Sequence, residues 1–186
     1  MDNALSARHV AGVTLIEMLV VIIIVSILTA LGSSAYRSVT NSNRIAAEIN
    51  SLLGTLQYGR YEAIREGQPV TICVSTDGSS CTGGTAWQGG WIAFADANGN
   101  GVVDTGEAVL RVQPPFSSTD TFTASNSVSA ITFNREGFAA GIANGTLVTL
   151  HDYTSNSTWT RCLSITLVGV MNSMVAGASV NGNSCT

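Results

Sequence analysis

The sequence predicts an α+β fold in which one long N-terminal helix packs on a domain of antiparallel strands. Three observations lead to this fold class. An apolar run of 19 residues, Val13–Leu31, contains a single charged residue. Apolar residues then recur at helical spacing, and no proline interrupts the chain before Pro69. Beyond Pro69, short apolar or alternating segments are separated by residues typical of turns, which predicts strands.

The apolar run is long enough to cross a membrane. As a helix, its 19 residues span roughly 28 Å, close to the ~30 Å hydrocarbon core of a bilayer. Its one carboxylate, Glu17, is costly in lipid and therefore calls for a partner. If the chain is cut after Gly12, the new amine of Val13 in a neighbouring subunit can pair with Glu17. The alternative is that Glu17 lies at headgroup depth and pairs with nothing.

The string Gly12-Val13-Thr14-Leu15-Ile16-Glu17, followed by this apolar run, resembles the type IV prepilin signal. In that family, prepilin peptidase cuts after the glycine and methylates the new N-terminus. The resemblance implies a leader at residues 1–12 and a helix at 13–35 that anchors the chain in the inner membrane and forms the filament core. The rest of the chain is then expected in the periplasm. The alternative is an ordinary secretory signal peptide cut within residues 30–35, which leaves Glu17 and its distance from Gly12 unexplained.

Residues 36–66 predict an amphipathic continuation of the helix. Apolar residues follow a 3.6-residue spacing, which indicates one buried face; they are Ile45, Ile49, Leu52, Leu56 and Ala63, with Leu53 and Ile64 widening the stripe. The charged residues occupy other faces of the helix; they are Arg44, Glu48, Arg60, Glu62, Arg65 and Glu66. Gly32-Ser33-Ser34, between the two helical segments, favours a bend or a local loss of helix.

Residues 67–186 predict a β-rich domain. The expected strands are Val70–Val74, Gly90–Ala95, Glu107–Val112, Ser129–Phe133, Gly145–Leu150 and Arg161–Leu167. Pro114–Ser127 is rich in Ser and Thr and predicts a loop. The last segment, Gly169–Thr186, predicts a floppy tail that a disulfide could hold.

The four cysteines predict two disulfides, because their number is even in a chain expected to be exported. Three pairings are possible, and proximity in sequence favours Cys73 with Cys81 and Cys162 with Cys185. Such bridges indicate an oxidising compartment.

One loop fits a calcium-binding pattern. The segment from Asp96 to Glu107 matches D-x-[DN]-x-[DN]-G-x₅-E, in which alternating oxygens and a distal glutamate can enclose calcium. The expected ligands are Asp96, Asn98, Asn100, Asp104 and Glu107. The same residues also suit a turn between strands, and the flanking strands argue against an EF-hand. Apart from this possible calcium, no cofactor is expected.

The β-rich part is similar to the GspH/FimT family of minor pilins and pseudopilins. The matching residues are Arg60–Ile64, Val70–Cys73, Trp87, Gly90–Ile92, Phe94, Asp96, Asn98–Gly101, Ile131–Phe133 and Gly137. The resemblance implies a non-enzymatic subunit that acts in the assembly or priming of a type IV pilus or a type II secretion pseudopilus. Its partners would be other minor and major pilins or pseudopilins, and prepilin peptidase would process it.

A DNA-uptake pilin is the alternative within this family. One branch uses a Gly-Arg-x-Arg motif near the C-terminus, whereas the counterpart here, Gly169-Val170-Met171-Asn172, has no arginine. The chain carries a formal net charge of −4 and its eight basic residues form no cluster, so nucleic acid is not expected as a partner. No motif assembles a catalytic group, and an enzyme is not predicted.

Overall fold

The computed structural model describes residues 12–143, 145–180 and 182–186. Of the predicted leader, residues 1–12, only Gly12 lies within the described residues. The chain forms two compact units, which divide between Thr40 and Asn41.

A single α-helix, α1 (Leu15–Glu66), includes both predicted helical segments. It begins after Thr14, whose hydroxyl accepts a hydrogen bond from the Glu17 N–H at 3.2 Å and so caps the first turn. The helix continues through Gly32–Ser34, so of the two expected alternatives, a bend or a local loss of helix, the loss does not occur. The weak helix propensity of such residues costs at most about 1 kcal/mol each, which does not interrupt a helix of 52 residues.

The first unit presents the apolar side chains of α1 to the outside. An 18-residue window of this helix has a mean hydropathy of 2.7, and the helix is long and apolar enough to cross a membrane. The Ser26 hydroxyl donates to the Ile22 carbonyl at 2.6 Å, and the Thr29 hydroxyl donates to the Val25 carbonyl at 2.7 Å. These hydroxyls are satisfied by their own helix, as a lipid environment requires.

In the second unit, α1 buries the predicted stripe. Five apolar residues of this stripe are at most 2% exposed; they are Ile45, Ile49, Leu52, Leu56 and Ala63. Gly59 lies on the same face, where an added Cβ would stand only 2.6 Å from Ile72 Cδ1. The missing side chain therefore lets the helix backbone approach the sheet closely. Ile64, predicted to widen the stripe, is instead 51% exposed.

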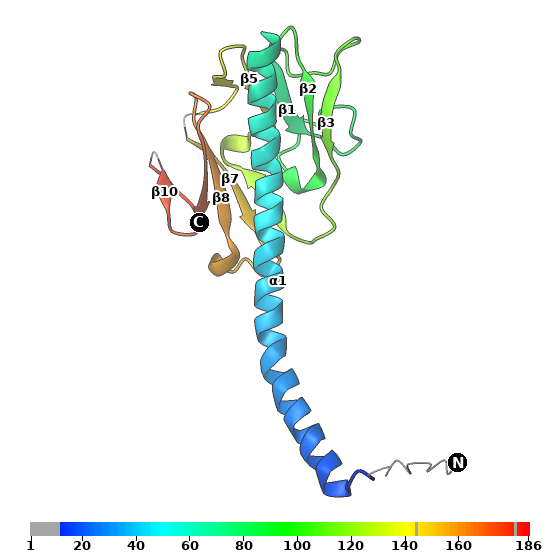
Figure 1. Ribbon diagram of the computed structural model, residues 1–186. Helices are drawn as coiled ribbons and strands as arrows, with labels where there is room; N and C mark the ends of the chain where they lie inside the picture. The colour runs from blue at the N-terminus through cyan, green and yellow to red at the C-terminus, as the bar shows by residue number, and fades with distance from the viewer. Residues whose placement is uncertain (1–11, 144, 181) are drawn as a thin grey trace, which may run out of the picture. The chain divides into compact units, whose positions relative to one another are not determined.

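The helix packs on the first sheet, which has five strands in the order β3-β2-β1-β5-β6, all antiparallel to their neighbours (Figure 1). Its strands are β1 (Val70–Val74), β2 (Trp91–Ala95), β3 (Val109–Gln113), β5 (Ala130–Phe133) and β6 (Ala139–Ala140). The predicted strands in this region are confirmed with small differences at their ends. The two-residue β6 was not predicted.

The outer face of this sheet is also buried at β1 and β2, whereas at β3 it is exposed. Cys73, Ile92 and Phe94 form a small cluster there, and Cys81 and Val103 pack against it. These two residues come from the segments after β1 and after β2, so two loops cover the face that α1 leaves free. This double covering explains why all five residues of β1 are buried.

The second sheet has four strands in the order β4-β7-β8-β9 (Figure 1). They are β4 (Thr121–Ala124), β7 (Thr146–His151), β8 (Arg161–Ile165) and β9 (Met171–Val175). A short hairpin, β10 (Ser179–Val180) and β11 (Asn183–Ser184), follows. Three 3₁₀ turns complete the described elements: η1 (Trp87–Gly89), η2 (Ser125–Ser127) and η3 (Ser157–Trp159).

The loop prediction for Pro114–Ser127 was wrong in part, and the C-terminal segment, which the expected Cys162–Cys185 disulfide does hold, has more regular structure than was predicted. Pro114–Ser127 is not wholly a loop, because it contains β4, which pairs with β7 and buries Phe122. The C-terminal segment is not a floppy tail, because it contains β9 and the hairpin. Both segments are rich in small polar residues, and their strands form through pairing with β7 and β8 rather than through a local apolar pattern.

A central core joins the stripe of α1 to both sheets. Trp87 and Trp91 are fully buried in it, and the Trp87 indole N–H donates to the Val128 carbonyl at 3.1 Å. The Trp91 ring lies edge-on to Phe116, with 5.6 Å between the ring centroids. The two tryptophans are therefore core residues and form no open platform for a ligand.

The close approach at Gly59 can be tested against Gly54, a glycine of the same helix with nothing within 4 Å of an added Cβ. We expect Gly54→Ala to raise the free energy of unfolding by up to about 1 kcal/mol, because alanine favours helix. Gly59→Ala should be less stable than Gly54→Ala by about 2 kcal/mol, because its methyl group overpacks the contact with Ile72. Thermal or chemical unfolding of the full chain in detergent measures the difference, and equal stability of the two variants would contradict the close contact.

Candidate functional site

The residues of the predicted processing and assembly site stand at the start of the described chain. Gly12 and Val13 precede the helix and are exposed, and Glu17 lies in the first turn of α1, also exposed. A carboxylate in that position also complements the partial positive charge of a helix N-terminus. The expected pairing of Glu17 with a Val13 amine joins two subunits, and it stays a prediction.

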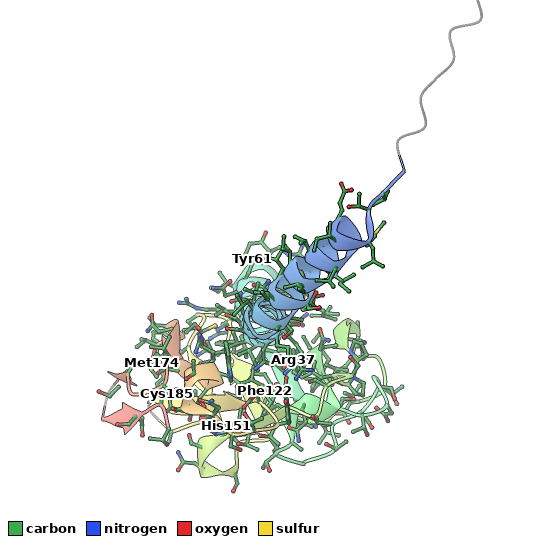
Figure 2. All side chains as sticks on the ribbon, turned by 90° about the horizontal axis from the view of Figure 1, so that it is seen from below. Arg37, Tyr61, Phe122, His151, Met174 and Cys185 are labelled. Carbon is green, nitrogen blue, oxygen red and sulfur yellow. A yellow bond between two sulfur atoms is a disulfide. The ribbon has the colours of Figure 1, made fainter. Side chains whose placement is uncertain are left out.

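The cysteines pair as proximity in sequence favoured. One disulfide joins Cys73 and Cys81, and the other joins Cys162 and Cys185. The first closes the loop that covers the outer face of the first sheet. The second fixes the C-terminal hairpin on β8, where Cys162 and Cys185 share a buried cluster with Leu147 and Met174. Met174 and Cys185 of this cluster are labelled in Figure 2. Both bridges hold segments that have few other apolar anchors.

The calcium-like segment is the connection between the antiparallel strands β2 and β3. Asp96 is fully buried, and its carboxylate accepts hydrogen bonds from the Thr71 hydroxyl at 2.6 Å and from the Asn100 and Gly101 N–H groups at 3.0 and 2.9 Å. Glu107 accepts from the Ala97 N–H at 2.9 Å. These oxygens are therefore already used to hold the turn.

The remaining predicted ligands are also bonded to one another. The side-chain amides of Asn98 and Asn100 both donate to the same oxygen of Asp104, each at 2.8 Å. The Asp104 N–H in turn donates to Glu107 at 3.0 Å. These hydrogen bonds hold the turn together without a metal ion, and calcium binding by these residues stays a prediction.

A buried polar cluster, here called the polar clamp, ties α1 to two loops. Arg44 donates to both carboxylate oxygens of Asp120, at 2.8 and 3.1 Å. The Asn41 amide donates to Asp152 at 3.3 Å, and Asn41 also accepts from Arg44. Burial acts to raise the pKa of Asp152, but the hydrogen bonds that its carboxylate accepts outweigh this effect and hold the pKa below its ordinary value. The clamp thus fixes one end of the second unit's helix.

Glu48 completes the polar clamp. It lies outside the predicted apolar stripe, yet it is only 8% exposed. One of its oxygens accepts from the Ser118 hydroxyl at 2.9 Å, whereas the other is buried without a hydrogen-bond partner. Glu62 is buried as well, at 6% exposure, but it is bonded to Arg65. Buried unpaired carboxylate oxygens are costly, so Glu48 is a weak point of the domain.

A groove of about 520 Å³ lies between the last turns of α1 and the turn from β8 to β9. It is lined by Gln57, Arg60, Tyr61, Ile64, Gly169, Val170 and Met171. The sequence placed Arg60 outside the apolar stripe of the helix and did not predict this groove. The sequence did contain a signal for this groove. Its four helical lining residues, Gln57, Arg60, Tyr61 and Ile64, are spaced three or four positions apart and therefore lie on one face of the helix.

The other arginines near the C-terminal half are engaged within the domain. Arg135 pairs with Glu136 at 2.8 Å. Arg161 donates to the carbonyls of Thr158 and Thr160 at 3.1 and 2.9 Å. In the described residues they form no patch of free positive charge that would attract a nucleic acid backbone.

Comparisons with known proteins agree with this architecture. The chain matches the family described as "Type II transport protein GspH" over residues 48–169, about two-thirds of its length. It also matches the "Prokaryotic N-terminal methylation motif" over residues 7–33. No curated protein matches the chain.

Two crystal structures of the type IV minor pilin FimU of Pseudomonas aeruginosa share the fold, each with a TM-score of 0.53. Their sequence identities to the chain are 23% and 22%. The matches cover 77% and 81% of this chain and 99% of each FimU chain. At this identity the likeness speaks for the fold alone.

A long N-terminal helix with a methylation motif, followed by antiparallel sheets, defines a pilin-like subunit with an apolar anchor. Such subunits are structural proteins that assemble with other pilins. Within this class, the GspH family model matches residues 48–169, which is most of the chain. The chain belongs to the GspH family of minor pilins and pseudopilins.

The unpaired oxygen of Glu48 predicts that Glu48→Gln stabilises the domain. The substitution removes a buried charge next to Asp120 and keeps a carbonyl oxygen for Ser118, so we expect the free energy of unfolding to rise by about 1 kcal/mol. Glu62→Gln is the matched control on the same helix, and it should lower stability because it weakens the pair with Arg65. Melting curves of both full-length variants at neutral pH measure the two effects. A destabilised Glu48→Gln would contradict the conclusion that the buried Glu48 carboxylate lowers the stability of the domain.

The hydrogen bonds of the Asp96–Glu107 segment predict that the turn does not depend on calcium. A ligand at about 100 times its Kd stabilises a protein by about 2.7 kcal/mol, so about 5 mM calcium would reveal a site with a Kd of about 50 µM. We expect the melting temperature to be the same in calcium, in magnesium and in a chelator. A rise in calcium alone, lost in Asp104→Asn, would establish the metal site instead.

Proposed function

We propose that the chain is a non-enzymatic minor pilin or pseudopilin that acts in the assembly or priming of a type IV pilus or a type II secretion pseudopilus. The observation that carries this proposal is the apolar half of α1. Its side chains are exposed and its hydroxyls are satisfied internally. A surface of this kind needs lipid or the apolar helices of other subunits around it.

Processing would precede assembly. Prepilin peptidase would cut after Gly12 and methylate the amine of Val13, and the match to the methylation motif supports this step. The helix would then anchor the chain in the inner membrane with residues 67–186 in the periplasm. The two disulfides support this location, because such bonds persist in oxidising compartments.

Assembly would transfer the helix from lipid to the filament core. Glu17 of one subunit would pair with the Val13 amine of its neighbour, and each charge would then have a partner in an apolar environment. DNA capture is not favoured, because the counterpart of the family's DNA motif lacks arginine and Arg135 is ion-paired.

The proposal predicts that Glu17→Ala is processed normally but fails to assemble. We expect a mature N-terminus at methylated Val13 in mass spectrometry and at least a tenfold loss of the chain from sheared filaments, because an unpaired amine would remain in the core. Ser26→Ala is the control in the same helix, since its hydroxyl bonds only to its own backbone. Wild-type incorporation of Glu17→Ala, or a mature chain that begins beyond residue 31, would overturn the proposal.

A further inference from the structure

The groove beside the last turns of α1 combines apolar walls with one cation. Tyr61 is 62% exposed, Ile64 51% and Val170 46%, and all three line the groove. Tyr61 lies at the surface of the domain (Figure 2). Large apolar side chains gathered at a concave surface are typical of sites where another molecule binds.

Arg60 supplies the positive charge of this groove. Its guanidinium donates to the Gly137 carbonyl at 2.9 Å and to the Val168 carbonyl at 3.4 Å. Within the described part of the chain, no carboxylate forms an ion pair with Arg60, whereas Arg44 and Arg65 on the same helix are both paired. Two backbone carbonyls use only part of the five N–H donors of an arginine, so the charge and some donors are left for a ligand.

Two glycines hold this arginine in place. Gly137 and Gly169 have φ values of +81° and +75°, and an added Cβ would stand 3.1 and 2.8 Å from Arg60 Nε. A Cβ on Gly169 would also meet the Gly137 carbonyl oxygen at 2.3 Å. Any side chain at either position would push the guanidinium away, so the backbone is shaped around it. A side chain fixed in this way loses little entropy on binding.

We propose that this groove binds an acidic side chain, carried in an apolar segment, of a neighbouring pilin-type subunit. The carboxylate would pair with Arg60, and the residues around it would pack on Tyr61, Ile64 and Val170. Charge complementarity selects the acidic group, because a planar carboxylate matches the fork of an arginine. The volume of about 520 Å³ admits a few side chains. This inference rests on the proposed function, since it supplies a contact between assembled subunits.

The same surface does not suit a nucleic acid. A phosphate backbone needs several cations, and Arg60 is the one cation among the described residues that line the groove. The apolar walls have no counterpart in a phosphate chain. A single carboxylate in an apolar segment matches both the one cation and the apolar walls of the groove.

Photocrosslinking of the full chain in its native cells tests the contact. p-Benzoylphenylalanine would replace Tyr61 in the groove or, as the matched control, Tyr153, which is 69% exposed and lines no part of the groove. We expect a crosslink from position 61 and not from 153. Mass spectrometry should identify the product as a pilin-type subunit and map the attached peptide next to an Asp or Glu.

The role of the charge is tested with a second matched pair. Arg60→Gln should reduce the crosslink from position 61 about tenfold, whereas Arg161→Gln should leave it unchanged. Arg161 is a suitable control because it also donates to two backbone carbonyls. Arg60→Lys should restore part of the yield, which separates loss of charge from misfolding, and the melting temperature of each variant checks the fold.

Several results would overturn the groove proposal. They are an absent crosslink in chains that still enter filaments, a product that is not a pilin-type subunit, and a yield that Arg60→Gln does not change. Arg60-dependent retention of DNA by the full-length protein in a gel shift would assign the groove to nucleic acid instead. Failure of the proposed function has a different signature, since the wild-type chain would then be missing from filaments altogether.

Discussion

The contact between one stripe of α1 and the inner faces of two sheets is the interaction on which the domain depends. Each large apolar side chain of that stripe contributes about 1.5–3 kcal/mol when fully buried. The contact distance is set at Gly59, where the helix backbone lies against Ile72 of the central strand β1. Both sheets meet this helix, so the first sheet, the second sheet and the loops that cover them all take their position from it (Figure 1).

The two halves of the same helix satisfy opposite requirements. From Asn41 onward the helix is amphipathic and its apolar side packs within its own domain. Before that point the apolar side chains are exposed on every face, and the hydroxyls of Ser26 and Thr29 are bonded inside the helix. Such a segment is stable only among other apolar groups. This property links the fold to the behaviour of the GspH family, whose members assemble with other pilins.

Internal pairing and hydrogen bonding engage part of the charge of the domain. Arg44, Arg65 and Arg135 each pair with a carboxylate, and Asp96 and Asp152 accept several hydrogen bonds inside the fold. The polar clamp and the turn between β2 and β3 therefore stabilise the fold through carboxylate and amide side chains, which are residue types that often bind ligands. Arg60, like Arg161, has no carboxylate partner among the described residues, but it also lines a groove together with the exposed apolar side chains of Tyr61 and Ile64.

Local patterns were sufficient for a large part of this structure. The helical spacing from Ile45 to Ala63 predicted the buried face of α1, and alternation or short apolar runs predicted β1, β2, β5, β7 and β8. The order of Gly12, Glu17 and the apolar run indicated the family, because the N-terminal motif of the family is a contiguous stretch of sequence. Proximity along the chain also favoured the observed disulfides, since short loops are the easiest to close.

The tertiary structure alone decided the features that depend on distant partners. The strands β4 and β9 form because β7 and β8 offer them hydrogen bonds, and their own residues show little pattern. Glu48 is buried because Ser118 and Asp120 come to it from another part of the chain. Arg60 faces a groove because two glycine turns, far along the sequence, leave room for its guanidinium. Periodicity records which side of an element is apolar, whereas the burial of a single polar group is set by residues that only folding brings together.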